Sequence, residues 1–241
     1  MSAHAEQRAW QLVLEHIERE FLDARLGPGA RLPSERELAS QLGVGRSSVR
    51  EAFRVLEIIG LIRTSTGSGP SSGAIVIATP SEGLSVLMRL QVAARAFPLA
   101  DVVQTRLVLE DAVAASLASN NIRDLAEPRR LLDAMDADDL STADFLALDA
   151  QFHLSLAESS GNVVIAAMMA GLRTAIESYV LTASARIDDW GAMTARLRAE
   201  HREIVAAFEA ADADAARRRV RNHITDYYRA SGMTASTGKN D

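Results

Sequence analysis

The spacing of apolar residues is helical over most of the chain, and the first such stretch runs from about Ala5 to Ala24. A second stretch, SERELASQL, begins with Ser34 and Glu37 in the spacing of a helix capping box. Gly43 interrupts it, and SSVREAFRVLEIIG then repeats apolar residues one turn apart. Two short helices across a tight glycine-containing turn predict a helix-turn-helix.

Two short strand-like runs follow, from Leu61 to Thr66 and from Ala74 to Ala78. The segment GSGPSSG separates them, which predicts two strands joined by a flexible tip, the wing of a winged helix. The alternative is a flexible linker between domains. We favour the wing because strand-like runs flank the tip on both sides.

Beyond Ser81 the pattern is helical throughout. Helices are expected at about 82–96, 99–119, 123–137, 142–159, 162–187, 190–210 and 212–230. The predicted fold class is therefore mainly α, with an N-terminal winged helix-turn-helix and a C-terminal all-α helical bundle. We expect a DNA-binding domain at 1–79, a helical domain at 80–232 and a disordered tail at 233–241.

Composition narrows the class of protein. The chain has 241 residues and no cysteine, which excludes disulfides and thiolate metal sites. Neither a signal peptide nor an apolar run of membrane-spanning length is recognisable, so we expect a soluble cytoplasmic protein with no membrane partner.

The charge balance argues against non-specific DNA binding, because residues 1–80 contain nine arginines and nine acidic residues. The positive charge is local: Arg46, Ser47 and Arg50 begin the second helix of the helix-turn-helix. An arginine there can bind a guanine edge through two hydrogen bonds. The alternative is an ordinary solvated helix face.

The segment around these helices resembles the signature of the GntR family of bacterial transcription regulators, through PGARLPSERELASQLGV, VREA and GLI. One departure is Gly45, where the family has Ser, which weakens the cap of the second helix. The resemblance implies a homodimer on an inverted-repeat operator of double-stranded DNA. It implies DNA contacts by Ser34, Arg36, Arg46, Ser47, Arg50 and Gly67.

A second constellation lies in the helical half. Asp149 and His153 are four residues apart, on one face of one predicted helix, while His201 and His223 lie on two others. A carboxylate and three imidazoles can surround a divalent metal inside a bundle. This ligand set suits zinc first, and nickel or another first-row metal. The alternative is that each histidine is an ordinary hydrogen-bonded residue.

The patterns D-x-x-x-H, E-H-x-x-I and x-H-I resemble the metal site of the FCD domain found in the FadR subfamily of GntR regulators. The resemblance extends over about residues 84–230 and implies four metal ligands, namely Asp149, His153, His201 and His223. The acyl-CoA-binding branch lacks this set, so we expect no acyl-CoA effector.

The same resemblance implies that Arg106, in TRLVLE, points into an effector cavity and binds the effector together with Glu110, one turn further on. Arg173 is a second candidate for effector binding. An arginine beside a metal suits a small carboxylate. From the residues alone, Arg106 and Glu110 are equally compatible with an ion pair on a solvated helix face.

Together these features predict a metabolite-responsive transcription regulator, a repressor, that senses a small carboxylate at a metal-containing pocket. The wing GSGP-SG and the segment FL-LDAQFH are similar to those of L-lactate-utilisation regulators of actinobacteria, which makes L-lactate the preferred effector. The alternatives are a metal-dependent hydrolase-like enzyme and a direct metal sensor. No H-E-x-x-H motif is present, so we do not expect an enzyme.

Overall fold

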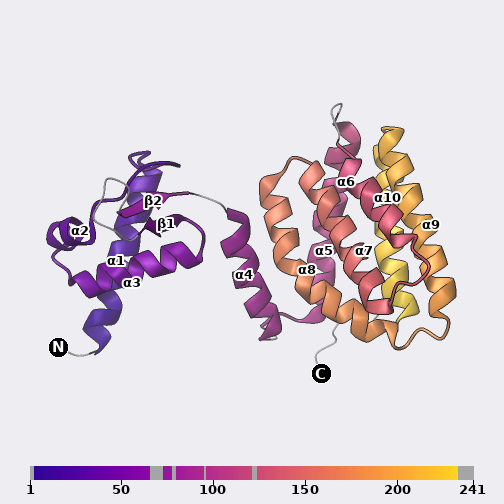
Figure 1. Ribbon diagram of the computed structural model, residues 1–241, viewed down its shortest axis with the longest axis horizontal. Helices are drawn as coiled ribbons and strands as arrows, with labels where there is room; N and C mark the ends of the chain where they lie inside the picture. The colour runs from indigo at the N-terminus through magenta and orange to yellow at the C-terminus, as the bar shows by residue number, and fades with distance from the viewer. Residues whose placement is uncertain (1–2, 66–72, 78–79, 95, 121–123, 233–241) are drawn as a thin grey trace, which may run out of the picture. The chain divides into compact units, whose positions relative to one another are not determined.

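The computed structural model describes residues 3–65, 73–77, 80–94, 96–120 and 124–232 (Figure 1). The chain forms two compact units, Met1–Val86 and Leu87–Asp241, which divide within helix α4 (Pro80–Ala93). The predicted wing tip, with Gly67, and the predicted disordered tail lie outside the described residues.

The first unit is built on three helices, α1 (Ala3–Leu22), α2 (Glu35–Leu42) and α3 (Arg46–Ile58). Their apolar faces meet in one core, where α1 contributes Val13 and Ile17, and α3 contributes Val49 and Phe53. Burial of these faces at helical spacing explains why the predicted stripes form helices.

The start of α2 and the turn between α2 and α3 have the capping residues that the sequence predicts. Ser34 and Glu37 form a capping box: Glu37 N–H donates to the Ser34 hydroxyl, and Ser34 N–H donates to the Glu37 carboxylate. Gly43 ends α2 at φ +66°, a left-handed conformation that favours glycine. Gly45 precedes α3 without a side-chain cap. The predicted helix-turn-helix is confirmed.

The wing strands β1 (Ile62–Ser65) and β2 (Gly73–Val76) pair antiparallel, with Ile62 opposite Val76 and Ser65 opposite Gly73. The segment before α2 adds a third line of backbone pairing, because Arg31 bridges to Ile75. Buried Ile62 and Val76 join the core of the first unit. The wing is therefore part of the domain rather than a linker.

The second unit is a helical bundle, whose neighbouring helices lie side by side in Figure 1. α5 packs on α10, α7 packs on both α6 and α8, and α9 packs on α10. Phe145, Phe152 and Phe208 are fully buried at its centre. The helices are α5 (Leu99–Ser119), α6 (Ala126–Met135), α7 (Thr142–Ser159), α8 (Val163–Ser184), α9 (Trp190–Glu209) and α10 (Ala213–Ala230).

Helix boundaries agree with the sequence pattern to within a turn. α6 is shorter than the predicted 123–137, because the Asp124 carboxylate accepts the Ala126 N–H at its start. α4 begins earlier than predicted, at Pro80, a residue suited to a first helical turn. No single helix in the described ranges is long and apolar enough to cross a membrane. The two halves of α8 meet that criterion together, by length and composition only.

Candidate functional site

The four residues predicted to bind a metal come together in the second unit. Asp149 and His153 lie one turn apart on α7, His201 lies on α9, and His223 lies on α10. All four are buried, and one potential ligand atom from each lies within 4.8 Å of the others. The structure thus has a buried group of one carboxylate and three imidazoles that could hold a metal.

The distances within this group fit a small metal ion. His201 Nε2 lies 3.0 Å from Asp149 Oδ1 and 3.2 Å from His223 Nε2. His153 Nε2 also lies 3.2 Å from His223 Nε2. Two ligands at about 2.0–2.1 Å from a tetrahedral zinc would be roughly 3.3 Å apart. The donor set and its spacing therefore fit a divalent first-row metal.

Two of the three imidazoles are hydrogen-bonded through Nδ1 to a carboxylate outside the candidate ligand set. His153 Nδ1 lies 2.5 Å from Glu110 Oε2, and His223 Nδ1 lies 2.9 Å from Glu200 Oε2. A carboxylate only accepts, so each Nδ1 carries a proton, which leaves Nε2 as the nitrogen that could bind a metal. Carboxylates in this position orient metal-binding histidines and raise their basicity.

His201 is held differently. Its Nδ1 has no hydrogen-bond partner among the described residues, and its ring packs against that of Phe152, with centroids 4.7 Å apart. Burial, followed by repulsion from His223, lowers the pKa of His201 to about 4. The imidazole is therefore neutral near pH 7, as a metal ligand requires.

Asp149 is the anionic member of the group. Burial by itself raises the pKa of its carboxyl, but the hydrogen bond from His201 and the electrostatic effect of the neighbouring histidines outweigh burial and lower this pKa. Asp149 therefore stays ionised, which also suits a cation at this position.

Arg106 and Glu110 form a buried ion pair on α5, with 2.7 Å between Arg106 Nε and Glu110 Oε1. The sequence left open an ion pair on a solvated helix face. The ion pair is present, but its predicted exposure is wrong, because only 3% of each residue is exposed. Burial raises the pKa of Glu110, but His153 and Arg106 overcome it and lower this pKa to about 2. The pKa of Arg106 is raised by Glu110 against the opposing effect of burial.

A small cavity brings Arg106 next to the possible ligand set. Arg106 lines it with Asp149, His223, Tyr227 and Tyr228. Apolar residues of α7, α8, α9 and α10 complete the wall, namely Leu146, Val180, Leu197 and Ile224. Arg106 and two of the four candidate ligands, Asp149 and His223, therefore line the same small cavity.

Arg173, the second candidate for effector binding, lies outside this cavity. It lines a separate small cavity together with Arg106 and His153. Its Nε donates to Glu177 Oε1 at 2.7 Å, and its side chain is 35% exposed. Arg173 does not line the cavity that contains Asp149 and His223.

The sequence reasoning missed Glu200 and Tyr227. Glu200 stands beside His201 in the E-H-x-x-I pattern, yet it contacts His223 of another helix, which no local spacing reveals. Tyr227 follows His223 by one helical turn, and this i, i+4 spacing could have placed it on the same face. Its hydroxyl donates to Val180 O on α8 at 2.7 Å.

The residues predicted to read DNA lie on the surface of the first unit. Arg46, Ser47 and Arg50 are exposed on the first turns of α3. Arg50 forms two hydrogen bonds to Glu35 of α2, at 3.0 and 3.2 Å, and Arg46 lies 4.0 Å from the same carboxylate. The hydrogen bond from Arg50 lowers the pKa of Glu35.

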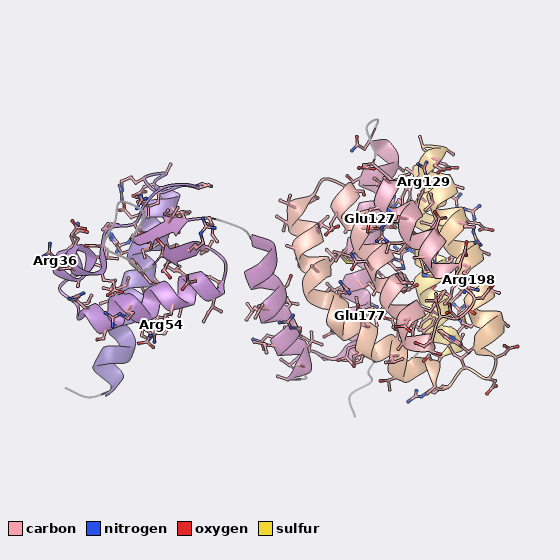
Figure 2. All side chains as sticks on the ribbon, in the orientation of Figure 1. Arg36, Arg54, Glu127, Arg129, Glu177 and Arg198 are labelled. Carbon is pink, nitrogen blue, oxygen red and sulfur yellow. The ribbon has the colours of Figure 1, made fainter. Side chains whose placement is uncertain are left out.

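Ser34 and Arg36 are also exposed. The Ser34 hydroxyl is engaged in the capping box with Glu37. Figure 2 shows Arg36 at α2 and Arg54 at α3, both projecting away from the ribbon. Arg46 and Arg50 therefore form a small exposed arginine patch at the start of α3, next to Glu35.

Comparison with known families agrees with this arrangement. Residues 101–226 match the FCD domain, and residues 11–70 match the bacterial regulatory proteins of the gntR family. The chain belongs to the GntR family of bacterial regulators and carries an FCD domain. These are transcription regulators that bind DNA and a small-molecule effector, and they are not enzymes.

Individual relatives match most of the chain. The chain is 30% identical over 230 residues to the HTH-type transcriptional repressor NanR of Citrobacter rodentium, covering 91% of this chain and 84% of that one. It is 28% identical over 204 residues to a protein of Escherichia coli K12 named for regulation of the L-lactate dehydrogenase operon, covering 84% and 78%. The solved structure of a Streptococcus agalactiae GntR protein shares the fold, at a TM-score of 0.55 and 24% identity over 92% of this chain and 99% of that chain.

Proposed function

We propose that this regulator is a homodimeric repressor that binds an inverted-repeat operator and is released by a small carboxylate. The carboxylate binds in the cavity between Arg106 and a metal held by Asp149, His153, His201 and His223. Zinc is the preferred metal, and L-lactate is the preferred effector.

The observation that carries the sensing part is that Arg106 shares one cavity with Asp149 and His223. A guanidinium has five N–H donors in a planar fork, so its contact with Glu110 through Nε is compatible with a second contact to an anion. A divalent metal held there would supply a Lewis-acidic position for a carboxylate oxygen. Arg106 then neutralises and orients the same anion.

The size of the cavity argues for a small effector. Its volume is about 10 Å³, which accommodates about one water molecule. Residues of five helices, α5 and α7 to α10, line it. An organic anion has to displace at least one of them, and this displacement gives the bundle a second arrangement with a different affinity for the ligand.

The DNA-binding part rests on the exposed arginine patch at α3. Because acidic and basic residues balance in residues 1–80, one such patch gives little non-specific attraction. Two patches in a homodimer would double the number of contacts on an operator with two half-sites. The name of the Citrobacter rodentium relative supports repression, and that of the Escherichia coli relative supports L-lactate.

The test is a calorimetric titration of the full-length protein with L-lactate, before and after treatment with a chelator. D-lactate, glycolate and pyruvate serve as matched small carboxylates. We expect saturable heat with L-lactate that disappears on chelation and returns with zinc. Heat that survives complete metal removal would overturn the metal's role in sensing.

Absence of heat with every carboxylate would overturn the carboxylate proposal. Operator binding is then measured at varied concentrations of free zinc. A DNA affinity that changes with zinc alone would identify a direct metal sensor. The operator is first selected from a random pool of duplex DNA.

A further inference from the structure

Glu110 is hydrogen-bonded to both halves of the proposed effector site, Arg106 and the candidate metal ligand His153. Its Oε1 accepts from Arg106 Nε at 2.7 Å, and its Oε2 lies 2.5 Å from His153 Nδ1. The carboxylate is 4% exposed, so water does not substitute for either partner. The family resemblance implied a different role for Glu110, direct binding of the effector together with Arg106.

The chemistry of these contacts requires a carboxylate. Arg106 is a donor and has no acceptor, and His153 has to donate from Nδ1 if its Nε2 is to bind a metal. A side chain between them must therefore accept from both, one on each oxygen. An uncompensated buried carboxylate is costly, so Glu110 also depends on its two partners.

We propose that Glu110 is a positioning residue shared by the metal site and the anion site. It fixes the tautomer of His153 that directs Nε2 toward Asp149, His201 and His223. It also holds the Arg106 guanidinium at the wall of the cavity. This inference rests on the proposed function, and it predicts that metal affinity and carboxylate affinity depend on one residue that contacts neither ligand.

The decisive variant is Glu110→Gln. A glutamine amide has the same shape but offers one accepting oxygen and one donating NH₂, so it cannot accept from Arg106 and His153 together. We expect zinc affinity to fall 10–100-fold, the usual effect of losing such a carboxylate, in competition with a chromophoric chelator. L-lactate should also bind more weakly at saturating zinc.

The matched control is Glu127→Gln. Glu127 pairs with Arg130 on α6 at 2.6 Å, as an exposed helix ion pair without a histidine (Figure 2). The substitution makes the same change in charge on the same bundle. Zinc and L-lactate affinities should stay at wild-type values, and a fall equal to that of Glu110→Gln would overturn the proposal.

Nitrogen NMR of ¹⁵N-histidine-labelled wild-type protein reads the tautomer directly, with Glu110 unchanged. The His153 signals are assigned by comparison with His153→Gln. The proposal requires a proton on Nδ1 of His153 in the metal-free protein, and a proton on Nε2 would overturn it. This readout also separates the two proposals, because it stands if no carboxylate binds and the proposed effector is wrong.

Discussion

At the residue scale, the hydrogen-bonded pair of Arg50 and Glu35 bears on the proposed DNA contact of the first unit. Both guanidinium–carboxylate hydrogen bonds are exposed, so the pair itself adds little to stability. Its effect is on geometry and charge: Glu35 fixes the arginine above α3 and offsets part of its attraction for phosphate. In the proposed mode of DNA binding, Glu35 therefore orients Arg50 before DNA binds.

We predict that Arg50→Ala removes about 1–3 kcal/mol of discrimination between operator and random DNA, a loss of about fivefold to 150-fold. Metal content should be unchanged, because Arg50 belongs to the first unit and all four candidate ligands to the second. Fluorescence anisotropy with both DNA probes and elemental analysis check the two halves of the prediction. Loss of metal would contradict the independence of the units.

Glu35→Gln is the companion variant. It frees Arg50 and adds one unit of positive charge, so affinity for random DNA should rise while the ratio of operator to random affinity falls. Glu51→Gln makes the same charge change on α3. If both variants change the ratio of operator to random affinity equally, charge alone explains the effect. The proposal that Glu35 orients Arg50 would then be wrong.

His201 gives the second prediction at this scale. Its pKa is lowered from 6.5 to about 4 by burial and His223, so in the metal-free protein the unfolded state binds more protons between these values. The free energy of unfolding should therefore fall as the pH drops from about 6.5 to 4, by on the order of 3 kcal/mol from this group. Urea titrations of chelated protein across this range measure the slope. A pH-independent free energy there would mean that His201 is already protonated in the fold.

At the element scale, the two glycines of the helix-turn-helix have opposite roles. Gly45 has φ −70° and ψ 146°, which any residue adopts, and it leaves α3 without a side-chain cap. Gly43 has φ +66°, where an added Cβ is strained although nothing lies within 4 Å of it. The sequence alone identified Gly45 as a departure from the family, and the backbone explains why glycine is not required there.

We predict that Gly45→Ser raises the free energy of unfolding of the first unit by a few tenths of a kcal/mol, through a hydroxyl that caps α3. Gly43→Ser should lower it by about 1 kcal/mol, because the left-handed conformation resists a side chain. Urea unfolding followed by Trp10 fluorescence compares the pair. Stabilisation by both serines would show that hydroxyl chemistry, and not backbone conformation, controls this turn.

Elements were more predictable than contacts between them. Apolar periodicity and breaks at Pro98 and Gly161 located α5, α7 and α8 because these signals are local. The pairing of Arg50 with Glu35 and of Glu200 with His223 joins different helices, so it depends on packing that no window of sequence contains. Spacing also could not decide whether Arg106 and Glu110 form a solvated or a buried pair.

At the scale of the whole molecule, the candidate ligands connect three helices of one unit and none of the other. Asp149 and His153 come from α7, His201 from α9 and His223 from α10. A metal bound by these side chains stabilises the bundle by mass action, since the unfolded chain does not bring them together. The first unit has its own core and shares none of these ligands.

The two tryptophans report on the two units separately. Trp10 packs against the core of the first unit, and Trp190 lies edge-on to Phe145 in the second, with ring centroids 6.1 Å apart. We predict that zinc at about 100 times its Kd stabilises the Trp190-reported unit by about 2.7 kcal/mol and raises its unfolding temperature by about 5–10 °C. Trp10→Phe and Trp190→Phe leave one reporter each for thermal unfolding followed by fluorescence. The Trp10 transition should not move, and His201→Ala should abolish the shift at Trp190. An equal shift of the unfolding temperature at both reporters would show that the two units unfold as one cooperative body. The metal would then act on the first unit through its stability and not through a change of conformation.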